Sequence, residues 1–417
     1  MEQATEATTE AATEFKSEVT AEAAEVIEAI MRQKEQKRTA VKSPAAKPRF
    51  AGIDIVKILA CFFVVGVHFF RNSDFYNMPI TKDFGTLAIY VRWLTFICVP
   101  LFMITTGFLM KNKTLSGKYY LGIIRVLVIY IFISLVCVRF NEAYFHLQYS
   151  THDVIRGLFM YTDAQYSWYV EYYFTIFLLI PFLNAGWQAM ETRGKKTAML
   201  ITVILLTMIS PSFYIGTVRT EQIRILPGYF ALCYPIGYYY IGAYIREFPP
   251  KRDLKHKLFF VILGLFALIY VSTMTLYQSM KNTEKNCVFF SWHNNDYGAW
   301  PVILLSVTVF LLLFDIRIKN KRAVKILSQL SNATFAAYLI SYVFDALFYQ
   351  KLIHSVAEIR DRFRYAPLIV PAVFILSMLS GLLIETVYEL AARRVKKDLA
   401  TIRQRKAHVI SRSGPQK

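Results

Sequence analysis

Long apolar segments recur along almost the whole of this 417-residue chain, and they restrict its fold more than any other feature. Hydrophobic residues make up 55% of the sequence and charged residues only 18%, which is too apolar for an ordinary soluble protein of this length. Runs of about 17 to 25 apolar residues predict membrane-spanning helices, because lipid offers an exposed backbone amide no hydrogen-bond partner. The chain is therefore predicted to be an all-α, polytopic membrane helix bundle.

Ten apolar runs are long enough to be assigned as spans. The fifth is the shortest, and Pro211 follows it directly. The predicted spans are residues 52–70, 87–110, 121–138, 167–184, 197–210, 228–245, 258–277, 298–314, 333–350 and 366–391.

The formal charge of +19 is concentrated beside these runs rather than in one patch, which argues against a nucleic-acid partner. Residues 32–49 hold seven Lys/Arg against one Glu, and residues 393–417 hold nine against one Asp. The positive-inside rule then predicts a multi-pass protein of the cell membrane with both termini in the cytoplasm, which requires an even number of spans. The predicted inner loops agree, with 16 Lys/Arg in 50 residues against 12 in 91 for the outer loops.

Three regions are predicted along the chain. Residues 1–48 form a solvated cytoplasmic tail with Glu at every fourth position from 2 to 22, residues 49–393 form the membrane domain, and residues 394–417 form a second, basic cytoplasmic tail. Basic flanks of this kind are attracted to anionic lipid headgroups, so membrane lipids are expected partners. The five cysteines show no zinc-ligand spacing, and no metal is expected.

Two ionisable residues, Lys57 and His68, lie inside the first apolar run. On a helix, eleven residues bring His68 back to within roughly 20° of Lys57 and about 16 Å further along the axis. Ionisable groups within a span usually face a bundle interior or a watery cavity, where they mark a working path. The alternative is a snorkelling Lys57 with a hydrogen-bonded core histidine.

Other intramembrane charges sort by depth into two layers. Arg125 and Glu385 fall in the inner half, near Lys57, whereas Glu171 and Asp345 fall in the outer half, near His68. An inner basic pair suits a phosphorylated cytoplasmic donor, because Arg binds phosphate through two parallel hydrogen bonds and Lys binds it as a point charge.

A neutral imidazole is the usual general base for taking a proton from a hydroxyl group. A carboxylate on the other ring nitrogen would orient the imidazole. On depth alone Glu171 is the first choice for that carboxylate, and a structural ion pair between Glu171 and an outer-loop Arg is the alternative reading.

These residues resemble a known family, the membrane acyltransferase-3 family of bacterial O-acyltransferases. The similarity begins with a basic residue and a histidine eleven positions apart in the first span and continues in chain order to the penultimate span. The matching segments are residues 53–57 and 65–68, residues 99–109 ending in Thr-Gly-Phe-Leu, Arg125 with Leu127 and Tyr130, residues 168–181, and residues 337–340.

The resemblance implies an acyl-CoA co-substrate, usually acetyl-CoA, that is reached from the cytoplasm. It also implies a carbohydrate or other hydroxyl acceptor in cell-envelope synthesis, with His68 as the catalytic residue and Lys57 and Arg125 at the donor. Thr106 is expected to donate a hydrogen bond in the same cavity. Two other functions stay open on the sequence, a transporter or flippase of a glycan or lipid-linked sugar, and an inactive scaffold.

Overall fold

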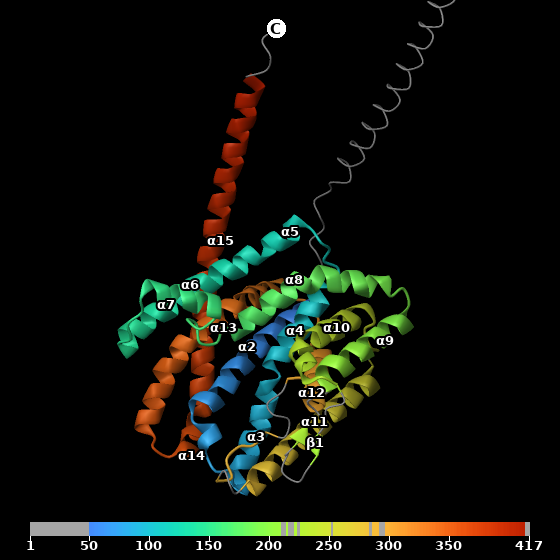
Figure 1. Ribbon diagram of the computed structural model, residues 1–417, viewed down its shortest axis with the longest axis vertical. Coiled ribbons are helices and arrows are strands. Elements are labelled where there is room, and N and C mark those ends of the chain that lie inside the picture. The colour runs from blue at the N-terminus through green and yellow to red at the C-terminus, as the bar shows by residue number, and fades with distance from the viewer. Residues whose placement is uncertain are drawn as a thin grey trace, which may run out of the picture. The chain divides into compact units, whose positions relative to one another are not determined.

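The computed structural model describes residues 50–209, 214–215, 221–222, 226–251, 253–282, 286–291 and 297–412 (Figure 1). Each of the ten predicted apolar runs lies mainly within helical segments of this structure, which confirms the prediction of an all-α helix bundle. The predicted tail of residues 1–48 and the last five residues of the chain lie outside the described residues.

The main helices are α2 (Ala51–Asn72), α3 (Lys82–Phe96), α4 (Cys98–Met110), α6 (Ile124–Phe145), α7 (Thr151–Met160), α8 (Trp168–Ala189), α9 (Arg193–Ile204), α10 (Tyr234–Glu247), α11 (Leu254–Lys281), α12 (Trp300–Leu313), α13 (Lys321–Ser355) and α15 (Ala366–Arg412). Shorter helical pieces are α5 (Gly117–Tyr120), α14 (Ile359–Arg362), η1 (Phe75–Asn77), η2 (Leu121–Ile123), η3 (Leu205–Ile209), η5 (Gly228–Cys233) and η7 (Phe363–Tyr365). Two short strands, β1 (Tyr214–Ile215) and β2 (Glu221–Gln222), pair antiparallel.

Six helical segments among the described residues are long and apolar enough to cross a membrane, so this is a multi-pass membrane protein. They are Ala51–Asn72, Gly85–Met110, Gly117–Phe145, Trp168–Ala189, Leu254–Lys281 and Ile359–Asp398. Helix α12 is apolar but shorter, and α9 and α10 have only 12 and 14 residues. The number of ten spans therefore stays a prediction.

Helix α2, which carries Lys57 and His68, lies within the bundle (Figure 1). It contacts α3, α4, α12, α13 and α15. Its Val56, Ala60 and Val65 are almost fully buried among these neighbours. Burial on several sides fixes the rotation of α2 about its axis, and this rotation decides what its ionisable side chains face.

Helices α4 and α10 cross with their backbones in contact, and two glycines make this crossing possible. A Cβ atom on Gly107 would lie 1.9 Å from the carbonyl oxygen of Tyr239, and one on Gly242 would lie 2.0 Å from that of Ile104. No larger residue fits at either position without moving a helix. The glycine of the Thr106-Gly107-Phe108 motif is therefore explained by helix packing, which sets the place of Thr106 on the neighbouring face.

Helix α15 begins by packing against α13 and then extends beyond the other helices (Figure 1). It continues without a break through residues 393 and 394 to Arg412. The boundary predicted between the membrane domain and the basic tail thus falls within one continuous helix.

Candidate active site

A cavity of about 580 Å³ lies between helices α2, α3, α4, α6, α8 and α13. Lys57, His68, Thr106 and Arg125, which the sequence singled out from three different spans, all line it. Its wall is mostly apolar and aromatic, with Phe102 and Tyr169 among the larger side chains. Such a cavity can hold a ligand with a long apolar or amphipathic arm and orient it by a few polar groups.

His68 sits in a compact polar cluster at one end of the cavity. Its Nδ1 lies 3.4 Å from Oδ2 of Asp345, and its ring stacks on Tyr166 with 3.6 Å between centroids. The Tyr166 hydroxyl donates to the same Asp345 oxygen at 2.8 Å and accepts from the Asn72 amide at 2.9 Å. With 8% of His68 and 1% of Asp345 exposed, both side chains are held by packing, and Asp345 is held also by the hydrogen bond from Tyr166.

Glu171, the first choice for the carboxylate beside His68, is placed elsewhere. It is exposed and does not line the cavity, and the carboxylate beside His68 is that of Asp345. The reason is helical phase: Tyr169 faces the cavity from α8, and a residue two positions later points about 200° away. The prediction used depth along the span alone and did not consider which face of α8 carries Glu171.

Lys57 and Arg125 line the cavity together with Asn332, and all three share its other end. The Lys57 ammonium donates to the backbone oxygen of Ser331 at 2.5 Å. The Arg125 guanidinium donates to both carboxylate oxygens of Glu385, at 2.6 and 3.2 Å, and to the backbone oxygen of Asn332 at 3.3 Å. This pairing fixes the plane of the guanidinium.

Thr106 lines the cavity, but its hydroxyl donates to the backbone oxygen of Phe102, one turn earlier in α4, at 2.9 Å. Its proton is therefore used within its own helix in this structure. The oxygen keeps a lone pair with which it can accept a hydrogen bond.

Several residues of the site were not singled out from the sequence. Arg92 lines the cavity from α3, and Arg71 lines it one turn after His68. Arg92 lies inside the predicted span of residues 87–110. Like Lys57, it is an ionisable residue within an apolar run, and this feature could have identified it. No sequence feature marked Tyr166 and Asn72 as functional, because a tyrosine beside a span and an asparagine at a helix end are ordinary interfacial residues.

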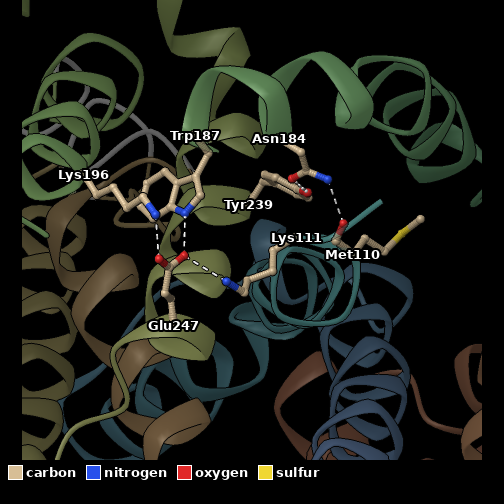
Figure 2. Close-up of polar contacts among 7 residues, drawn as sticks. All are labelled: Met110, Lys111, Asn184, Trp187, Lys196, Tyr239 and Glu247. Carbon is tan, nitrogen blue, oxygen red and sulfur yellow. Dashed lines mark hydrogen bonds and ion pairs between the residues drawn. The ribbon is translucent and has the colours of Figure 1, made fainter. Parts of the chain in front are cut away.

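A second polar cluster, formed by Lys111, Trp187, Lys196 and Glu247, ties together the ends of four helices (Figure 2). Glu247 at the end of α10 accepts hydrogen bonds from Lys196 at 2.6 Å, from Lys111 at 2.8 Å and from the Trp187 indole at 2.9 Å. This cluster lies toward the Lys57 end of the bundle, because Arg246 stacks on Phe50, which precedes α2.

Beside this cluster, Asn184 holds the end of α4 (Figure 2). Its amide donates to the backbone oxygens of Met110 and Lys113, and its side-chain oxygen accepts from the Tyr239 hydroxyl at 2.6 Å. Carbonyl groups at the end of a helix have no partner within it, so these bonds stabilise the end of α4. Met110 also lines the cavity, so the hydrogen bond from Asn184 supports the cavity wall.

Replacing Glu247 by Gln is expected to lower the thermal stability of the protein at neutral pH. It should also make the thermal stability change less with pH in the acid range. Burial alone would raise the pKa of Glu247, but hydrogen bonds from Lys111, Lys196 and Trp187 outweigh it and lower the pKa from 4.5 to about 2. A lowered carboxyl pKa stabilises the fold above pH 4.5, and this contribution is lost as the pH falls toward 2.

Melting curves of the detergent-solubilised protein between pH 3 and 7 test this. The wild type should lose more stability than Glu247→Gln across the acid range, whereas the exposed-site control Glu191→Gln should follow the wild type. Identical curves for wild type and Glu247→Gln would contradict the role given to this cluster.

One of three comparisons with known proteins gave a match. The family model Acyl_transf_3, described as an acyltransferase domain, matches residues 50–386, which include every residue of the site named above. The searches of curated proteins and of solved structures gave no match. Because one family model covers most of the chain, this multi-pass membrane protein belongs to the Acyl_transf_3 family of acyltransferases.

Proposed function

We propose that this acyltransferase moves an acetyl group from acetyl-CoA to a hydroxyl of a carbohydrate or other cell-envelope acceptor. The observation that carries the proposal is that one cavity holds His68, backed by a carboxylate, at one end and the cations Lys57 and Arg125 at the other. About 16 Å of helix separates Lys57 from His68, a span that suits the extended pantetheine arm of coenzyme A.

The donor is proposed to enter from the cytoplasm, with both chain termini on that side of the cell membrane. Lys57 and Arg125 would bind phosphates of the nucleotide, with Glu385 holding the Arg125 guanidinium in plane. The apolar wall between the two ends, which includes Phe102 and Tyr169, would enclose the pantetheine arm and exclude water from the thioester.

His68 would act as the general base. Its Nε2 takes the proton from the acceptor hydroxyl as the hydroxyl oxygen attacks the thioester carbon, and Asp345 stabilises the imidazolium through Nδ1–H. The tetrahedral intermediate then expels the coenzyme A sulfur, which receives the proton from the imidazolium. The products are the acetyl ester and coenzyme A, so no further co-reactant is needed.

Transfer of label from radiolabelled acetyl-CoA tests the proposed function. Envelope fractions incubated with proteoliposomes that contain the purified protein should gain label as an ester that mild alkali releases, and empty liposomes should give none. Uptake of glycan into the liposomes without ester formation would support transport instead and would contradict the proposal.

Replacing Lys57 by Met is expected to weaken coenzyme A binding by about 10- to 100-fold, because a hydrogen bond to a charged group contributes about 1.5 to 3 kcal/mol. Titration of the purified protein with coenzyme A measures this change. Lys118→Met is the matched control, because it removes one exposed positive charge that does not line the cavity. Equal affinities for Lys57→Met and Lys118→Met would place the donor elsewhere.

A further inference from the structure

The wall between the two ends of the cavity carries hydroxyl groups as well as apolar side chains. Tyr169 and Tyr173 line the cavity from α8, and Thr105 lines it from α4. We propose that these three hydroxyls form a hydrogen-bonding subsite for the two amide groups of the pantetheine arm, so that they select a donor that carries this arm. The inference rests on the proposed function, because it concerns the donor of that reaction.

The pantetheine arm has two amide groups along an otherwise apolar chain. An amide that leaves water and regains no hydrogen bond in the protein loses free energy. A channel with only apolar side chains along its length would therefore bind the arm weakly. Polar groups in the wall, placed where the amides pass, remove this penalty.

The hydroxyl groups of Tyr169 and Tyr173 are available to a ligand. Both residues are partly exposed, and neither hydroxyl forms a hydrogen bond with any residue that the structure describes. A tyrosine hydroxyl can donate one hydrogen bond and accept another, so it can serve either atom of an amide. Other tyrosines of the bundle use their hydroxyls within the protein, as Tyr119, Tyr130, Tyr239 and Tyr240 do.

The spacing of the two tyrosines matches that of the two amides. Tyr173 follows Tyr169 by four residues, so both side chains lie on a similar face of α8, about 6 Å apart along its axis. The two amide nitrogens of the arm are four bonds apart, which is roughly 5 Å in an extended chain. An arm that runs along α8 can thus place one amide at each hydroxyl.

The neighbours of the two tyrosines decide which amide meets which hydroxyl. Tyr173 interacts electrostatically with Arg125, at the donor end of the cavity. Tyr169 comes three residues after Tyr166, whose ring stacks on His68. The amide nearer the nucleotide is therefore assigned to Tyr173, and the amide nearer the thioester to Tyr169.

Thr105 contributes the third hydroxyl. It is 3% exposed, and its hydroxyl has no hydrogen-bond partner among the described residues, whereas the neighbouring Thr106 donates to the backbone one turn earlier. Leaving a buried hydroxyl without a partner costs free energy, so a ligand that bonds it gains affinity. Threonine in a helix adopts two side-chain rotamers, and the hydroxyl can turn toward the cavity that Thr105 lines.

Coenzyme A and two of its fragments separate the arm from the nucleotide. Tyr169→Phe, Tyr173→Phe and Thr105→Val each remove one hydroxyl, and each should weaken coenzyme A binding to the purified protein by about 3- to 10-fold. 4′-Phosphopantetheine keeps the arm and should be weakened by the same factor. Adenosine 3′,5′-bisphosphate lacks the arm, so it should bind the wild type and all three variants equally.

A coenzyme A analogue in which two methylene groups replace the amide nearer the nucleotide tests the pairing directly. Tyr173→Phe should no longer weaken binding of this analogue, because the amide that it served is missing. Tyr169→Phe should still weaken it by about 3- to 10-fold, because the other amide is intact. The opposite pattern would overturn the assigned register of the arm.

Two further variants make the binding test specific. Tyr144→Phe removes the hydroxyl of an exposed tyrosine that does not line the cavity, and it should bind every ligand as the wild type does. Lys57→Met should weaken binding of adenosine 3′,5′-bisphosphate, which reports that this fragment occupies the donor end. The three hydroxyl variants should melt with the wild type in the absence of ligand, because no described residue bonds the groups that they lose.

The results can contradict the subsite and the proposed function separately. A substitution that leaves coenzyme A binding unchanged would overturn the role of that hydroxyl. Equal weakening of coenzyme A and adenosine 3′,5′-bisphosphate in the three variants would indicate a structural role and would overturn the subsite. Failure of coenzyme A to bind the wild type would contradict the proposed function itself.

Discussion

Replacing His68 by alanine is expected to lower acetyl transfer by about 10² to 10⁴-fold, the contribution that a well-placed general base makes. The imidazole is the only titratable group at its end of the cavity that can take a proton from a hydroxyl, among the described residues that line it. Lys57 at the donor end is about 16 Å away along α2, so coenzyme A binding should be unchanged. Label transfer from acetyl-CoA and a coenzyme A titration on the same preparation measure both quantities.

His354→Ala is the matched control, because His354 is exposed and does not line the cavity. It should transfer acetyl groups at the wild-type rate. A His68→Ala variant that binds coenzyme A and transfers at more than one tenth of the wild-type rate would exclude His68 as the base.

Replacing Asp345 by asparagine is expected to lower kcat by about 10²-fold while the KM for acetyl-CoA stays within about twofold. The carboxylate lies 3.4 Å from Nδ1 of His68 and stabilises the positive charge that the ring acquires in the transition state. Asparagine has nearly the same shape and can still accept from the Tyr166 hydroxyl, so the packing of the cluster is kept. Asp345 is thus a positioning residue that acts through His68.

Glu171→Gln is the control for this variant, because Glu171 lies in α8 at a similar predicted depth but is exposed. Its kcat should stay within about twofold of the wild type. Loss of activity in Glu171→Gln with normal kinetics in Asp345→Asn would reverse the assignment. A fall in kcat and a rise in KM of equal size for Asp345→Asn would indicate a structural role instead.

The sequence was sufficient to predict the all-α helix bundle and to single out four of the residues that line the cavity. Apolar runs predicted the helices because membrane helices are defined by length and composition, which a linear sequence carries directly. Lys57 and His68 were found because both belong to one helix, where helical periodicity fixes their relative direction. Arg125 was singled out because placing a charge within a membrane span costs free energy, so charged residues are rare there and stand out in the sequence.

What the sequence could not supply was contact between distant helices. The pairing of His68 with Asp345 joins residues in α2 and α13 that are far apart in the chain, and periodicity within one helix says nothing about the rotation of another. Depth favoured Glu171 over Asp345, and the packing of α8 and α13 places Asp345 beside His68 instead. The pairing of Arg125 with Glu385 joins α6 and α15 and was hidden for the same reason.

A cryo-electron microscopy structure of the protein with a non-hydrolysable acetyl-CoA analogue tests the central claim most directly. We predict phosphate density beside Lys57 and Arg125, with the pantetheine arm running along Phe102 and Tyr169 to an acyl group at His68. An analogue bound outside this cavity, or bound with its nucleotide beside His68, would contradict the account.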